Sequence, residues 1–224
     1  MVTGITIEAL AKRYPRLYHM AAGDSLESIF RHGLLSTTAL LDLFEVQAPA
    51  REIIEGRRRP ASVPITHPTH GRATIRDQKP MSEKKLAKSL RDGLTPPAWY
   101  RRLNDKVFFW LTEKRLETLL NAREYRNTRR LVLTVDSRPL LEAYREKVVL
   151  SPMNSGNTSP FAHPRGADTF LPLDSYPFED RRKRGLEPVV ELGVLGGIPD
   201  IKTYIISADE LSETSVRKRV YERV

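Results

Sequence analysis

The uninterrupted apolar runs of this sequence are short, which limits what the chain can fold into. The clearest run is residues 107–111 (VFFWL), and residues 131–133 form a shorter one. A helix that crosses a bilayer needs roughly 20 consecutive apolar residues, whereas a buried strand needs only about 4 to 8. The sequence therefore predicts buried strands and no transmembrane helix, and we expect no membrane partner.

Stretches with helical spacing separate these short strands. Leu26, Ile29 and Phe30 recur at helical spacing before Gly33, and residues 113–121 form an amphipathic pattern directly after the aromatic strand. Further helices are expected at 39–47, 82–90, 96–100 and 137–144, and strands at 17–20, 107–111, 130–136, 147–150, 189–194 and 203–207. This mixture predicts a single α+β domain over residues 1–224 rather than a doubly wound βαβ series.

Three segments depart from this regular patterning. Residues 48–80 are rich in Pro, Arg, Thr and His with little periodicity, so we expect an irregular excursion. Residues 151–188 contain many turn-forming residues and predict a loop-rich insert. Residues 212–224 predict a basic helical tail.

The charge balance favours a polyanionic partner. Lys and Arg number 37 against 28 Asp and Glu, for a formal net charge of +9. Solubility alone is the simpler explanation, but arginines gather in clusters, and the planar guanidinium suits phosphate better than a lysine does. The clusters lie at 57–59, 101–102, 129–130 and 181–184.

Several chemical classes are excluded or disfavoured. The chain has no cysteine, which removes disulfides, thiolate ligands and a cysteine nucleophile and fits a reducing compartment. The N-terminus lacks the pattern of a secretory signal, so we expect a cytoplasmic protein. Neither a dinucleotide-binding glycine motif, a P-loop nor a GxSxG elbow occurs. His67 and His70 have no third ligand nearby in the sequence, so no metal site is expected.

One glutamate stands in an otherwise apolar strand. Glu191 interrupts the sequence VVELGV of residues 189–194, and a buried carboxylate costs free energy unless a partner or a function requires it. From this segment alone, Glu191 could equally be a solvent-facing residue on the outward face of the strand. A functional role needs further support from other segments.

Such support comes from a resemblance to the ADP-ribosyltransferases, nearest to the DarT-like enzymes that modify DNA. The pattern YH at 18–19, a helix ending in HGLL, the FFWLT strand leading into a helix, and the late VVELGV strand are similar to that family over residues 17 to about 206. The resemblance implies an ADP-ribosyltransferase-like fold, a split mixed β-sheet with flanking helices and long loops. It also implies that NAD is the substrate.

The resemblance assigns roles to particular residues. Glu191 matches the catalytic glutamate, which stabilises an oxocarbenium-like transition state when the nicotinamide bond breaks. His19 matches the histidine that contacts the NAD ribose. Arg76 closes the irregular excursion, so we expect it to bind the pyrophosphate. The remaining expected NAD contacts are Tyr18, Phe109 and Trp110, although Phe109 and Trp110 also suit plain core packing.

The same resemblance implies where the acceptor binds. In that family the loop before the catalytic strand selects the acceptor, so residues 178–185 are expected at the mouth of the site. Val189 replaces the second acidic or glutamine residue of arginine-modifying toxins, which favours a nucleic acid over a protein as the acceptor. The resemblance to the DarT-like enzymes implies DNA rather than RNA. The expected nucleic-acid contacts are Arg181, Arg182, Lys183, Arg184 and Arg165, and Asn154 and Ser155 are expected near either site.

Other functions remain open from the sequence. The same fold supports NAD hydrolysis or transfer of an RNA 2′-phosphate. A non-catalytic basic module that binds nucleic acid is the alternative outside enzymes, with Glu191 then structural. If the chain is a toxin, we expect a neutralising antitoxin protein as a second partner.

Overall fold

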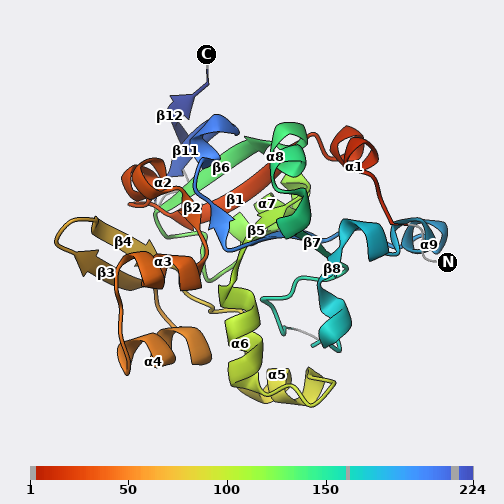
Figure 1. Cartoon of the computed structure of the whole chain (residues 1–224), viewed down its shortest axis with the longest axis horizontal. Coiled ribbons are helices and arrows are strands. Elements are labelled where there is room, and N and C mark those ends of the chain that lie inside the picture. The colour runs from red at the N-terminus through yellow and green to blue at the C-terminus, as the bar shows by residue number, and fades with distance from the viewer. Residues whose placement is uncertain (1–3, 160–161, 213–216, 224) are drawn as a thin grey trace.

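The computed structural model describes residues 4–159, 162–212 and 217–223, and the chain folds as an α+β protein (Figure 1). Its strands are β1 (Arg16–Ala22), β2 (Leu34–Leu35), β3 (Val63–His67), β4 (Gly71–Ile75), β5 (Lys106–Trp110), β6 (Arg130–Asp136), β7 (Val148–Ser151), β8 (Leu171–Pro172), β9 (Glu191–Leu195), β10 (Gly197–Ile198), β11 (Ile205–Leu211) and β12 (Arg217–Glu222). Its α-helices are α1 (Ile7–Arg13), α2 (Leu26–His32), α3 (Thr37–Leu43), α4 (Ala50–Gly56), α5 (Glu83–Ser89), α6 (Pro96–Asn104), α7 (Glu113–Leu120), α8 (Ser137–Ala143) and α9 (Phe178–Lys183). Short 3-10 turns occupy Arg145–Lys147, Ala167–Thr169, Leu173–Ser175 and Ile201–Thr203.

The main sheet is divided into two halves. In the described part of the chain its strand order is β12-β11-β6-β1-β5-β9-β7-β8, and each of its pairings is antiparallel. Strand β1 pairs with β6 along its whole length, but within the described residues it pairs with β5 at Tyr18 and Trp110 alone. The two halves therefore separate beyond this pair. The split was expected from the resemblance, whereas the expected mixed sheet was wrong.

Apolar side chains cover both faces of the central strands. Along β6, Leu131, Leu133 and Val135 enter the largest core cluster, while Val132 packs on the other face with Leu116 of α7. Strand β6 is buried on both faces because apolar residues stand at successive positions of its sequence, and successive side chains point to opposite faces. The strand order places β1, β5 and β9 in the middle of the sheet, and Figure 1 shows β1 and β5 in the middle of the molecule.

Gly33 allows the turn after α2 to approach the β10 strand closely. It has a φ of 89°, and a Cβ at this position would lie 2.4 Å from Pro199 Cα. A larger residue would therefore meet both backbone strain and a steric clash. This turn leads into β2, which pairs with β10 through Leu34 and Ile198.

Residues 48–80 are more regular than expected. They form helix α4 and the hairpin of β3 and β4, so the expected irregular excursion was wrong. The hairpin is stable because Ile65, Ala73 and Ile75 pack in one cluster with Leu41 and Phe44. Pro64 stands inside β3 and Gly71 begins β4, and both residue types weaken the sequence signal of a strand.

Two other expectations need correction. The basic tail was expected to be helical, but residues 217–222 form strand β12; residues 213–216 and 224 of that segment lie outside the described residues. Arg217 and Arg219 pair with the buried carboxylate of Asp209 on β11, which favours the strand. Within the loop-rich insert 151–188, residues 178–183 form helix α9.

The helices of the described residues are all short. None of them is long and apolar enough to cross a membrane. They pack against one another and against the sheet: α1 contacts α8, and Leu10 of α1 and Leu140 of α8 lie in the same core cluster as Leu17 of β1.

Candidate active site

A cavity of about 290 Å³ opens where the two halves of the sheet separate. Its walls come from β1, β5, the start of β9, α2, the end of β4 and the loop at 154–156. Five of the six side chains expected to act in catalysis or NAD binding line it: His19, Arg76, Phe109, Trp110 and Glu191. The structure thus brings together residues from distant parts of the sequence.

Glu191 is the most deeply buried carboxylate of this cavity, with 5% of its surface exposed. It is the first residue of β9, in register with Trp110 on one side and Ser151 on the other. Ser155 donates two hydrogen bonds to its Oε2, from N–H at 2.9 Å and from Oγ at 2.6 Å. Burial raises the pKa of Glu191 to about 7, although the Ser155 hydrogen bonds oppose this rise.

The loop that holds Glu191 is itself held by Arg165. The Arg165 guanidinium donates to Ser155 O at 2.9 Å and to Asn157 O at 3.0 Å, and it lies over the Trp99 ring. Arg165 is 0% exposed, so its expected contact with a nucleic acid was wrong. Its role is to position Ser155.

His19 is a neutral hydrogen-bond acceptor on the cavity wall. Its Nδ1 lies 2.9 Å from Phe108 O, and because a carbonyl only accepts, Nδ1 carries the proton. Burial lowers the pKa of His19 to about 4, so the ring is neutral near pH 7 and Nε2 has a free lone pair. The fully buried Phe109 ring packs against the imidazole, with 5.7 Å between ring centroids.

Two arginines line the cavity beside these groups. Arg76 donates from Nη1 to Met20 O at 2.7 Å, and its guanidinium lies over the Tyr125 ring. Arg59 was not expected here; it donates to Arg76 O at 2.9 Å and to Ile54 O at 2.6 Å. Burial lowers the pKa of Arg59 to about 10, which leaves it charged at neutral pH. The arginine cluster at 57–59 is visible in the sequence, but nothing in the sequence shows that Arg59 is the buried member of it.

Tyr18 does not line the cavity. It lines a separate hollow with Arg13, Arg16 and Thr112, and it packs with Trp110 and Met20, which do line the cavity. The structure therefore leaves Tyr18 outside the cavity, where a contact with NAD was expected.

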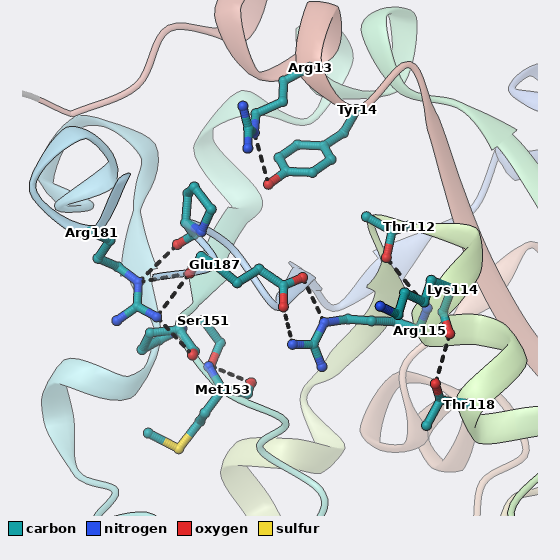
Figure 2. Close-up of polar contacts among 12 residues, drawn as sticks. Arg13, Tyr14, Thr112, Lys114, Arg115, Thr118, Ser151, Met153, Arg181 and Glu187 are labelled. Atoms are coloured by element: carbon teal, nitrogen blue, oxygen red, sulfur yellow. Dashed lines mark hydrogen bonds and ion pairs between the residues drawn. The ribbon is translucent and has the colours of Figure 1, made fainter. Parts of the chain in front are cut away.

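The cations of residues 181–184 do not reach the cavity. They lie in α9 and, for Arg184, directly after it, and α9 lies beside α1 at the end of the molecule opposite the β3–β4 hairpin (Figure 1). Figure 2 shows Arg181 directed at backbone carbonyls, and it donates to Pro188 O at 3.0 Å and Pro152 O at 3.2 Å. Arg182 pairs with Glu179 at 2.7 Å. Lys183 and Arg184 are exposed, but the expected place of this segment at the mouth was wrong.

A second ion pair fixes the segment before β9. Arg115 of α7 binds both carboxylate oxygens of Glu187, as Figure 2 shows. The positive charge of Arg115 also lowers the pKa of Glu191, less than burial raises it. Arg115 and Arg181 therefore anchor residues 187–188 from two sides and position the start of β9.

The cavity combines three chemical properties. A buried carboxyl with a pKa near neutrality can stabilise a developing positive charge or accept a proton. The neutral imidazole can accept a hydrogen bond from a hydroxyl, and two guanidinium groups can bind an anion. Among the residues that the structure describes, no group of three or more His, Asp or Glu side chains is arranged to hold a metal ion.

One known family matches the sequence. Its description is "Family of unknown function (DUF7002)", and the match covers residues 15–205, which include β1, β5, β9 and the whole cavity. No curated protein matches the chain.

Proposed function

The chain belongs to the DUF7002 family, and we propose that it is an NAD-dependent ADP-ribosyltransferase that modifies a nucleic acid, DNA rather than RNA. The observation that carries this proposal is the meeting of His19 and Glu191 in one cavity at the split of the sheet. The resemblance of the sequence selects the same two residues from short motifs far apart in the chain. The split antiparallel sheet is, in this proposal, an ADP-ribosyltransferase-like core.

The proposed reaction begins with cleavage of the bond between C1′ of the nicotinamide ribose and the nicotinamide nitrogen. The electron pair leaves with nicotinamide, and positive charge develops at C1′, where the Glu191 carboxylate stabilises it. A nucleophilic atom of the acceptor then bonds to C1′. Its proton passes to Glu191, whose pKa of about 7 suits a general base.

The other residues of the cavity hold NAD in this scheme. His19 Nε2 accepts a hydrogen bond from a ribose hydroxyl, which requires the neutral imidazole that burial maintains. Arg76 binds the pyrophosphate, and Arg59 adds a second positive charge on the same wall. Trp110 is partly exposed in the cavity and offers an apolar face to the nicotinamide ring. A cytoplasmic location, where NAD is present, completes the proposal.

Labelled NAD tests the proposal directly. The wild-type protein, Glu191→Gln and the matched control Glu117→Gln are incubated with labelled NAD and separate pools of DNA, RNA and protein. Glu117 is exposed on α7 and does not line the cavity. We expect label in DNA from the wild type and the control, and at least a 100-fold lower rate from Glu191→Gln.

The products separate this reaction from its alternatives. Free nicotinamide with unlabelled polymers would indicate NAD hydrolysis, and label in protein alone would assign a different acceptor. Absence of both nicotinamide release and label in the wild type would refute the transferase and leave a binding module as the better account.

A further inference from the structure

A second hollow lies outside the candidate active site, between the end of α1 and the start of α7. Its volume is about 320 Å³, which is within the range of small-molecule sites. One wall consists of residues 13–16 and Tyr18, and residues 111–112 form the other. Figure 2 shows Arg13 at the end of α1, across from Thr112 at the start of α7. In the described part of the chain, no residue lines both this hollow and the cavity.

The charged groups that line the hollow are two arginines. Arg13 and Arg16 are both exposed, and the residues that line the hollow include no Asp or Glu. Among the residues that the structure describes, neither guanidinium forms an ion pair with a carboxylate. The two positive charges are therefore open to a bound anion.

The guanidinium of Arg13 is already held in place. Its Nε donates to Tyr14 Oη at 3.3 Å, and its central carbon lies 5.6 Å from the centroid of the Tyr14 ring and 5.9 Å from that of Phe178. These contacts leave its two terminal nitrogens without a hydrogen-bond partner among the described residues. Because the group is positioned before a ligand arrives, less conformational entropy is lost on binding.

The hydroxyl of Thr112 adds a neutral donor. Thr112 is the N-cap of α7, and its Oγ1 accepts a hydrogen bond from Arg115 N–H at 3.4 Å. A threonine hydroxyl both accepts and donates. Its proton has no acceptor in the described part of the chain, so it is available to a ligand.

Tyr18 contributes both a hydroxyl and a ring. Burial raises the pKa of this tyrosine and Glu113 raises it further, while Arg16 and Arg217 offset only part of the rise. The hydroxyl is thus protonated at neutral pH and can donate. The Glu113 carboxylate is exposed and does not line the hollow, so solvent screens its repulsion of an anion.

We propose that this hollow binds a phosphate monoester that carries an aromatic ring. Two guanidinium groups match the charge of such an ester, about −1.5 to −2 at pH 7, better than they match a single carboxylate. The volume equals that of roughly ten water molecules, more than a free phosphate ion fills. Tyr18 and Pro15 offer apolar surface to the aromatic ring. The inference does not depend on NAD cleavage, because none of these groups takes part in the proposed reaction.

The bound ester would lie close to a tryptophan of the candidate active site. Tyr18 is in register with Trp110 across β1 and β5, and the two side chains pack in the same apolar cluster. Residues 111–112 of the hollow directly follow Trp110, which also lines the cavity. Occupation of the hollow should therefore change the fluorescence of Trp110.

Calorimetric titration with phenyl phosphate tests the proposal. The test variant Arg16→Gln removes one cation of the hollow, and the matched control Lys12→Gln removes an exposed cation of α1 that does not line it. We expect saturable binding by the wild type, at least about 10-fold weaker binding by Arg16→Gln, and a change within about twofold in the control. A fluorescence change should saturate at the same concentrations and be absent in Trp110→Phe.

Further ligands and variants define what is bound. Inorganic phosphate and phenol should each bind more weakly than phenyl phosphate, because each lacks one part of the ester. A lower Kd for AMP than for phenyl phosphate would identify a nucleotide as the source of the ester, and a higher one a smaller aryl phosphate. Binding should weaken at pH 5, since the second ionisation of a phosphate monoester has a pKa of about 6. Arg13→Lys keeps the charge but loses the planar fork and should also bind more weakly.

The outcomes separate this inference from the proposed function. No saturable binding by the wild type, equal loss in Arg16→Gln and Lys12→Gln, or loss in Arg76→Gln alone would overturn the hollow as a phosphate site. Thermal unfolding of each variant verifies that it is folded. Hollow-dependent binding by a protein that consumes no NAD would leave this site intact and refute the transferase.

Discussion

At the scale of single residues, Glu191 is a carboxyl group that costs the protein stability. Its pKa in the folded state is about 7, above the ordinary value of 4.5, because it is buried. The folded state thus holds the proton more tightly, so stability is full below pH 4.5 and falls as the pH rises through 7. We expect Glu191→Gln to be more stable than the wild type at pH 8 by about 2 kcal/mol in urea unfolding.

The pH series provides its own control. At pH 4 the wild-type carboxyl is protonated in the cavity, and the two proteins should differ by little. Glu117→Gln should match the wild type at both values, since that side chain is exposed. If Glu191→Gln is the less stable protein at pH 8, the Ser155 hydrogen bonds outweigh the cost of burial.

The same residue determines the expected pH profile of the proposed reaction. The value of kcat/KM for nicotinamide release should rise with pH around 7 as Glu191 loses its proton. His19 has a pKa near 4 and stays neutral across this range. His19→Gln should therefore raise KM without moving the midpoint. A second limb near pH 6.5 that this variant removes would show that the imidazole titrates, contrary to its buried position.

At the scale of elements, Arg165 connects the loop at 154–157 to the buried carboxyl of Glu191. It holds Ser155 O and Asn157 O, and Ser155 in turn holds Glu191. Arg165 Nε also donates to His163 O at 3.1 Å. We expect Arg165→Met to fill the space but remove the donor from all three carbonyls, with a loss of about 3 kcal/mol of stability. The exposed Arg91 supplies the control, Arg91→Met.

A specific readout separates positioning from general damage. When Ser155 no longer donates to Glu191, the pKa of that carboxyl rises further, because both hydrogen bonds lower it. The midpoint of the pH profile should then move upward in Arg165→Met at a temperature where the variant is folded. An unchanged midpoint with a lower rate would mean that Arg165 acts on stability alone.

The sequence predicts elements well where one periodicity dominates. The uninterrupted apolar run at residues 107–111 and the helical spacing before Gly33 both correspond to elements of the structure, β5 and α2. The hairpin of β3 and β4 was missed because a proline stands inside β3, and because its inward side chains are stabilised by α3 and Phe44. Strand β12 was missed because only its pairing with Asp209 on β11 distinguishes it from a basic helix.

The site was predictable to the extent that short motifs mark it. His19 and Glu191 stand out as polar residues in apolar strands, and both line the cavity. The roles of Arg59, Ser155 and Arg165 depend on loops that meet only in the folded chain, so no local pattern assigns them. The cations at 181–184 resemble a binding site in the sequence, but the guanidinium of Arg181 donates its hydrogen bonds to nearby backbone carbonyls.

At the scale of the whole molecule, the question is whether the separated halves of the sheet unfold together. The largest apolar cluster contains Leu17 and Leu133 from one half and Phe109 and Leu192 from the other. A second cluster around Trp99 lies at α5 and α6, at the lower edge of Figure 1. Phe108 and the stacking of Arg165 on Trp99 connect this cluster to the sheet and to the loop beside Glu191.

These connections predict a single cooperative transition for the chain. The protein has two tryptophans, so Trp110→Phe leaves Trp99 as the only tryptophan. Its fluorescence, excited selectively over that of tyrosine, reports the α5–α6 cluster, while far-UV circular dichroism reports the whole fold. The two probes should give the same urea midpoint, because the cluster cannot lose its packing without releasing Arg165 and Phe108. An earlier midpoint for Trp99 would instead show that α5 and α6 form a separate unit, able to open while the sheet around Glu191 remains folded.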